Sequence, residues 1–91
     1  MISVLKRRKE IKKLIGNEIS VFYEWLYVGN KKPSMTSVKR VSGEIVLIDV
    51  IFGNDLEVEK LIFQHKESKE VLKLVGPRVS GLLYRFKHKQ S

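Results

Sequence analysis

The segment from Arg40 to Phe63, RVSGEIVLIDVIFGNDLEVEKLIF, is the longest apolar stretch of the chain. Its first half is rich in Val and Ile and has two alternating faces that are both mostly apolar, which predicts a central strand covered on each side. Gly53-Asn54-Asp55 favours a turn, and Leu56 to Phe63 is expected to return as a second strand. The apolar positions change parity near Lys60, which predicts a bulge or bend of the kind that closes a small barrel.

The flanking segments predict one helix and several further short strands, separated by turns centred on glycine. The predicted fold is therefore a single mainly β domain over residues 1–91: a small Sm-like or SH3-like barrel of five or six antiparallel strands with an N-terminal helix. The expected elements are a basic helix or arm over 1–15, strands over 18–28, 36–42, 44–52, 56–63, 69–75 and 79–86 within a barrel spanning 18–87, and a frayed tail over 88–91.

Four aromatic residues are concentrated in the segment 18–28, which we interpret as the first strand, although its spacing also fits a helical stripe. They are Phe22, Tyr23, Trp25 and Tyr27. Exposed aromatic rings can stack on nucleic-acid bases. In so small a domain an aromatic cluster more often forms the core, and we expect Phe22 and Trp25 to lie there.

Composition argues against several classes of protein. The chain has no Cys, and His65 and His88 have no partner at the spacing of metal ligands, so we expect neither a metal site nor a thiol nucleophile. Glu57 and Glu59 share a strand face that could hold magnesium, but such surface carboxylates are usually solvated. No phosphate-binding loop or nucleophile motif occurs, and no apolar run approaches a membrane span. We expect a cytoplasmic protein with no catalytic site of its own.

The charge is strongly positive and unevenly distributed. The net charge is +8, with +5 in residues 1–15, +4 in 31–40, +4 in 77–91 and −5 in 41–59. Basic segments around an acidic hairpin predict binding of nucleic acid through its phosphates, whereas the alternative is that the lysines merely maintain solubility. The predicted RNA contacts are Lys6, Arg7, Arg8, Lys9, Lys12, Lys13, Lys31, Lys32, Lys39, Arg40, Arg78, Arg85, Lys87 and Lys89.

Three motifs give a resemblance to a known family. Residues 13–21, KLIGNEISV, residues 41–46, VSGEIV, and residues 53–59, GNDLEVE, are arranged as in archaeal ribonuclease P protein component 1. Gly76, Val79, Gly81 and Arg85 resemble the closing motif of that family, and Lys87-His88-Lys89 resembles its basic tail. The resemblance implies an Sm-like barrel that supports removal of the 5′ leader from precursor tRNA by a catalytic RNA.

The resemblance also implies partners and cofactors. The chain would bind ribonuclease P RNA and precursor tRNA and would pair with a zinc-ribbon protein subunit. It would be a monomer when alone and would bind no cofactor itself, since magnesium serves the endoribonuclease ribonucleoprotein as a whole. The alternative is a non-enzymatic Sm-like or SH3-like binding module, such as an RNA chaperone that forms a ring, a chromatin protein or a viral inhibitor. A module that binds only other proteins is a third class.

Overall fold

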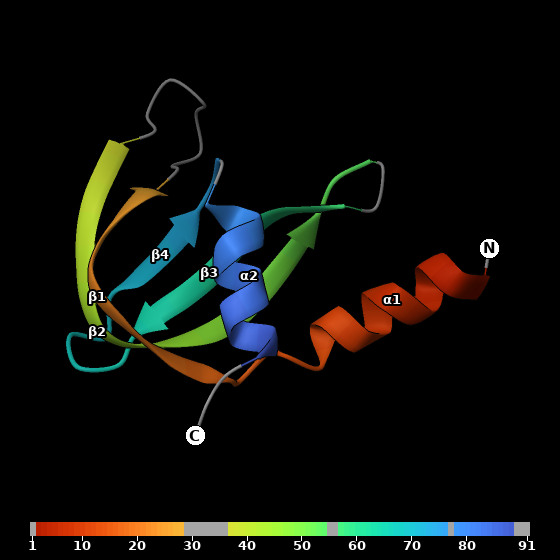
Figure 1. The fold of residues 1–91 in the computed structure, drawn as a ribbon, viewed down its shortest axis with the longest axis horizontal. Helices are drawn as coiled ribbons and strands as arrows, with labels where there is room; N and C mark the ends of the chain where they lie inside the picture. Colours follow the sequence, from red (N-terminus) through yellow and green to blue (C-terminus); the bar gives the residue numbers. More distant parts are fainter. Residues whose placement is uncertain (1, 29–36, 55–56, 77, 89–91) are drawn as a thin grey trace.

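The computed structural model describes residues 2–28, 37–54, 57–76 and 78–88, and it is mainly β (Figure 1). Its elements are α1 (Ile2–Lys12), β1 (Glu18–Val28), β2 (Ser37–Phe52), β3 (Val58–His65), β4 (Val71–Leu74) and α2 (Val79–Lys87). The strand interpretation of 18–28 is confirmed. No helix in the described part of the chain is long and apolar enough to cross a membrane.

The four strands form a closed antiparallel ring in the order β1-β2-β3-β4. Strand β4 returns to β1 through the pairing of Val28 with Leu74. The 16-residue β2 pairs with two strands: its first part pairs with β1 and its second part with β3. At the overlap Ile45 faces Ile19 on one side and His65 on the other. The two strands predicted over 36–42 and 44–52 are therefore one long strand that bends.

Gly43 lies at this bend of β2, with a φ of +115° that favours glycine. A Cβ atom there would lie 2.9 Å from Nε2 of His65, whose ring covers the glycine. The Nδ1 atom of His65 accepts a hydrogen bond from the Ser68 backbone N–H (3.2 Å), so Nε2 carries the proton and donates to the Ser42 carbonyl (2.7 Å). The imidazole thus joins the bend of β2 to the turn that follows β3.

The bulge predicted near Lys60 is confirmed. Lys60 pairs with Ile51, whereas the next pair along the strands joins Val58 to Phe52, so the register shifts at this point. A second shift occurs in β2 between Leu47 and Asp49. Such irregularities increase the bend and twist of a strand, which lets a small antiparallel sheet close on itself.

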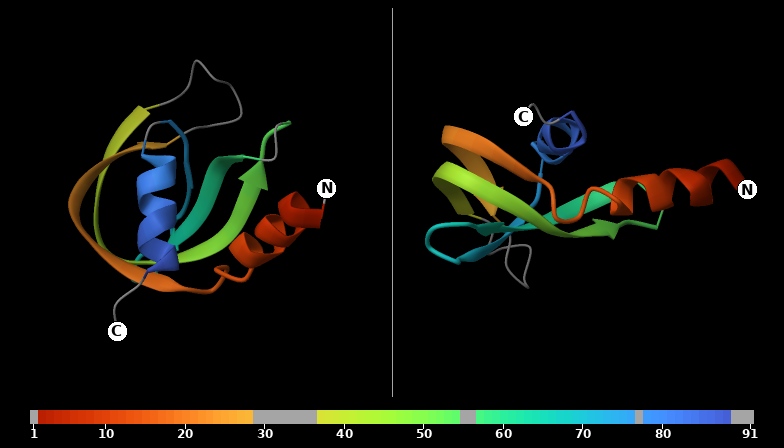
Figure 2. Two further views of the ribbon diagram at one scale, coloured as in Figure 1. Left: turned by 45° about the vertical axis from the view of Figure 1, so that its right-hand side comes forward. Right: turned by 90° about the horizontal axis from the view of Figure 1, so that it is seen from below.

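The prediction of a last strand over 79–86 is wrong, because this segment forms the helix α2 (Val79–Lys87). Val79, Leu82 and Phe86 are all buried and are spaced by three and four residues, which is the helical period. The helix packs against β3 and β1 and lies across the ring (Figure 2). The described residues thus contain four strands rather than five or six, and a helix covers the ring where a further strand was expected.

The core lies inside the ring and beneath α2. Its fully buried side chains are Leu26, Ile45, Leu47, Leu61, Phe63, Leu74 and Phe86. No polar side chain of the described residues is buried. Burying each of these large apolar side chains contributes roughly 1.5–3 kcal/mol relative to exposing it. The same core extends to α2, which therefore belongs to the folded unit.

Candidate nucleic-acid interface

Helix α1 carries the densest group of predicted contacts. Its axis points away from the ring, and the helix is in contact with β2 (Figure 1). The backbone N–H of Gly16 donates to the Leu47 carbonyl (2.7 Å), and the Leu47 N–H donates to the Asn17 carbonyl (3.0 Å). These two bonds fix the turn that follows α1 to β2, so the C-terminal end of the basic helix is attached to the sheet.

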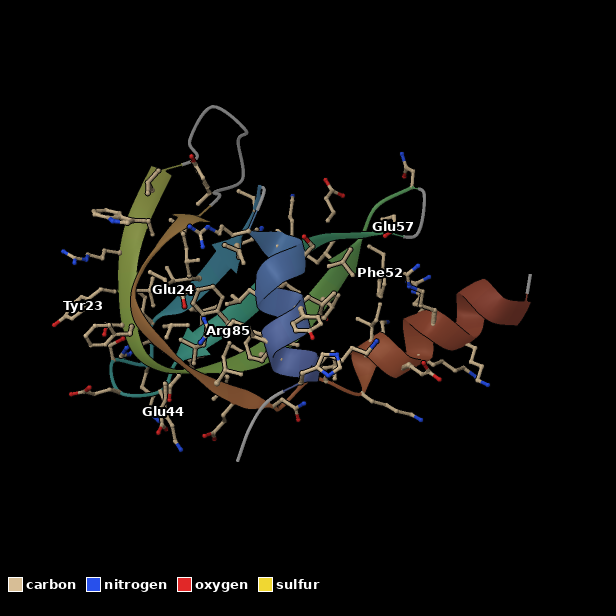
Figure 3. The ribbon with its side chains drawn as sticks, in the orientation of Figure 1. Tyr23, Glu24, Glu44, Phe52, Glu57 and Arg85 are labelled. Carbon is tan, nitrogen blue, oxygen red and sulfur yellow. The ribbon has the colours of Figure 1, made fainter. Side chains whose placement is uncertain are left out.

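Two arginines of α1 hold it against the hairpin of β2 and β3. The guanidinium carbon of Arg8 lies 4.9 Å from the centre of the Phe52 ring, within the range of a cation–π contact. Arg7 Nη1 lies 3.7 Å from Oε1 of Glu57. Both pairs are at the same end of the molecule, on the side where α1 projects (Figure 3). These arginines therefore have a structural role in addition to their charge.

The lysines of this segment are placed differently. Lys6, Lys9 and Lys13 follow one another at intervals of three and four residues, so they share one side of the helical turn. All three are exposed, as is Lys12. None of the four forms an ion pair with any residue that the structure describes. Their charges are available to an external anion.

The two predicted contacts in β2 have different surroundings. Lys39 Nζ lies 2.6 Å from Oε1 of Glu70, so its charge is compensated within the chain. Arg40 has no carboxylate partner among the described residues. Its guanidinium carbon lies 4.6 Å from the centre of the Tyr23 ring and 5.5 Å from that of Trp25. Arg40 and the two rings together form an exposed cationic and aromatic surface.

The prediction that Phe22 and Trp25 lie in the core is wrong. Phe22 is 79% exposed and Trp25 is 55% exposed. The register between β1 and β2 shifts between Val21 and Glu24, and within this bulge Tyr23 has a φ of +48°. The bulge reverses the alternation, so that Val21 and Leu26 fill the ring while the aromatic residues point outward. The core is aliphatic at β1 because of this extra residue.

The predicted contacts in α2 are also of two kinds. Arg85 forms an ion pair with Glu24 and donates a hydrogen bond to the Ser20 carbonyl, which joins α2 to β1 (Figure 3). Arg78 and Lys87 are exposed and form no ion pair within the described part of the chain. Lys31, Lys32 and Lys89 lie outside the described residues. The predicted contacts thus do not form one patch.

The internal partners of Arg85 lead to a stability prediction. Replacing Arg85 with Gln is expected to lower the free energy of unfolding by about 1–2 kcal/mol, because Glu24 is partly buried and loses its charged hydrogen-bond donor. Replacing Lys87 with Gln on the same helix is the matched control and should leave stability within about 0.5 kcal/mol. Urea unfolding of the two variants measures the difference. Equal midpoints would contradict a structural role for Arg85.

Lys66 was not among the predicted RNA contacts. It forms ion pairs with two carboxylates, one on β1 and one on β2. Its Nζ atom lies 3.1 Å from Oε2 of Glu18 and 3.5 Å from Oε2 of Glu44. The hydrogen bond with Glu18 and the negative charges of both carboxylates raise the pKa of Lys66. Two carboxylates that would repel a polyanion are thereby partly neutralised.

The potential metal-ligating side chains of the described residues are dispersed over the fold. No group of three or more His, Asp or Glu side chains there is arranged to hold a metal ion. His65 uses both ring nitrogens within the fold, and Glu57 faces Arg7. Comparison of the chain with protein-family models, with curated proteins and with solved structures finds no match. Its function is therefore inferred from the surfaces described above.

Proposed function

We propose that this protein binds RNA without catalysing a reaction of its own, and that α1 and the turn after it form its main phosphate-binding element. The observation that carries the proposal is the set of four exposed lysines, Lys6, Lys9, Lys12 and Lys13, none of which pairs with a described carboxylate. A projecting helix with this charge approaches the phosphates of a folded or single-stranded RNA without rearrangement of the sheet.

Phosphate neutralisation has a measurable consequence, because each contact releases condensed counterions. With four lysines engaged, the logarithm of the binding constant for single-stranded RNA should fall with the logarithm of salt concentration with a slope of about −3. The slope is measured by fluorescence anisotropy of a labelled RNA at several salt concentrations. Binding that does not depend on salt would contradict the proposal and favour a module that binds only other proteins.

The finer form of this proposal is a protein subunit of ribonuclease P with an Sm-like barrel. It is supported by the resemblance of residues 13–21, 41–46 and 53–59 to archaeal ribonuclease P protein component 1. The described ring and bend are compatible with it, since Gly16 lies where the turn after α1 meets β2 and Gly43 lies at the bend of β2. In this proposal the chain supports cleavage of precursor tRNA by the RNA and pairs with a zinc-ribbon subunit in an archaeal cytoplasm.

Reconstitution tests the finer proposal. An archaeal ribonuclease P RNA, its other protein subunits and precursor tRNA are combined at low magnesium, and removal of the 5′ leader is compared with and without this protein. Stimulated cleavage is the expected result. Salt-dependent RNA binding without stimulation would contradict the subunit assignment and leave a small nucleic-acid-binding module.

A module of that kind is the second candidate, and the exposed aromatic surface around Arg40 favours it. The oligomeric state distinguishes a ring-forming module from the ribonuclease P subunit. A ring of Sm-like subunits would sediment as a hexamer or heptamer, whereas the ribonuclease P subunit is expected to be a monomer when alone.

A further inference from the structure

We propose that the outer side of β1 and β2 is a second RNA site, at which Tyr23, Trp25 and Arg40 stack on unpaired bases of a single strand. We call these three residues and the adjacent Phe22 the stacking face. The proposal rests on the proposed function, since RNA is the polymer it assigns, but it concerns bases rather than phosphates and residues remote from α1. A base-stacking site gives the chain a preference for single-stranded over fully paired RNA.

The arrangement of the three side chains supports stacking. Trp25 and Arg40 are direct cross-strand partners, and Tyr23 and Trp25 are 52% and 55% exposed. The Arg40 guanidinium lies over both rings, at 4.6 and 5.5 Å from their centres. Aromatic rings and arginine planes are the groups on which proteins stack unpaired bases, because every base has a π face. The surface thus combines flat stacking partners with a positive charge.

The backbone holds the aromatic side chains at the surface. Tyr23 has a left-handed conformation that is sterically unfavourable for an aromatic residue. Glu24 follows directly and forms the ion pair with Arg85 of α2, so the bulge is tied to that helix. The rings of Phe22 and Tyr23 meet edge to face, with centres 4.7 Å apart. Their exposure is built into the fold and does not come from a loosely held loop.

Charge favours RNA over a second copy of this chain as the occupant. A symmetric dimer through the stacking face would bring two chains of net charge +8 together with Arg40 near its own copy. The described carboxylates Glu18 and Glu44 of β1 and β2 are already bound by Lys66. A single-stranded RNA instead provides negative charge for Arg40 and rings for Tyr23 and Trp25.

The position of the face makes it separately measurable. Tyr23 and Phe52 lie on opposite sides of the molecule, and α1 is on the side of Phe52 (Figure 3). Trp25 is the only tryptophan of the chain, so its fluorescence reports on the stacking face alone. A polyanion without bases binds at α1 and leaves Trp25 in contact with water, whereas a stacked base quenches it.

The test titrates the full-length protein with an oligouridylate of about 12 nucleotides, within the site sizes usual for single strands, and in parallel with inorganic polyphosphate. Trp25 emission reports stacking, and anisotropy of a labelled oligouridylate, with polyphosphate as competitor, reports binding. The expected result is that both polyanions bind and only the oligouridylate quenches Trp25. Binding of both without quenching would overturn the stacking face and leave the α1 proposal intact, whereas binding of neither would overturn both.

Variants assign the effect to residues. Tyr23→Leu should weaken oligouridylate binding by about 5-fold to 150-fold, the range for loss of one stacked base, and leave polyphosphate binding unchanged. Leu has the same left-handed backbone cost as Tyr, so the bulge is retained, and Arg40→Gln is a second variant that leaves the bulge untouched. The matched control is Tyr84→Leu, which removes an exposed tyrosine on α2. Equal weakening of oligouridylate binding by Tyr84→Leu would overturn the proposal. It would also be overturned if Trp25 emission changed with protein concentration alone and sedimentation showed a dimer.

Discussion

Replacing Phe86 with Ala is expected to lower the free energy of unfolding by about 3–5 kcal/mol. Phe86 is 0% exposed and lies in the last turn of α2, where its side chain joins the core inside the ring. The backbone carbonyl of Phe86 also accepts a hydrogen bond from Nδ2 of Asn17 (3.2 Å), which ties the end of α2 to the turn before β1. Because small domains have total stabilities of about 5–15 kcal/mol, this single change removes much of the margin.

The matched control for Phe86→Ala is Tyr84→Ala, two residues earlier on α2. Tyr84 is 63% exposed, so its loss should change stability by no more than about 0.5 kcal/mol. Thermal and urea unfolding, followed by circular dichroism, measure both variants. If the segment were a strand, Tyr84 and Phe86 would lie on one face and both substitutions would have similar effects. Similar losses would therefore contradict the helical position of Phe86 and its place in the core.

The strands of the central hairpin could be predicted because their signals are local, whereas part of the turn predicted over 53–55 lies outside the described residues. Alternation of Val and Ile identifies β2, the parity change near Lys60 identifies the bulge, and Gly43 marks the bend. The error at 79–86 has a local cause too. Leu82 and Phe86 satisfy both a period of two and a helical spacing of four, and only Val79 completes the helical series.

The exposure of the aromatic residues in β1 was harder to predict, although one signal was present. The aliphatic residues that fill the ring are Val21 and Leu26, which are separated by an odd number of positions. Strict alternation cannot place both inside, so an extra residue between them was required. The sequence does not say which residue adopts the left-handed conformation, because glycine is absent there and Tyr23 is an unfavourable choice.

Charge alone predicted which segments are basic but not which charges are available. Lys39 is paired with Glu70, 31 positions away, and Arg85 with Glu24, 61 positions away, so both pairings depend on closure of the ring. The lysines of α1 remained good candidates because the helix projects from the sheet and Glu10 is the single acidic residue within it. Availability is a property of the tertiary structure, whereas charge density is a property of the sequence.

The variant Lys6→Gln, Lys9→Gln, Lys13→Gln is expected to weaken binding of single-stranded RNA by about 100-fold at about 0.1 M salt, and to make the salt slope less negative by about 2. Each lysine that contacts a phosphate contributes about 0.7 to the slope on a single strand. Gln has nearly the same helix propensity as Lys, so α1 should persist. Anisotropy titrations at several salt concentrations measure the slope and the affinity together.

The matched control for this variant is Lys60→Gln, Lys69→Gln, Lys73→Gln, which removes the same total charge from β3, β4 and the turn between them. These lysines form no ion pair with a described residue, so the comparison isolates position from net charge. If RNA is held by the long-range field of the protein, both triple variants lose affinity equally. If it is held at α1, the control retains most of its salt slope, because counterions are released only where phosphates are contacted. Equal salt slopes in the two variants would contradict the assignment of α1 as the phosphate-binding element, even if the protein still bound RNA.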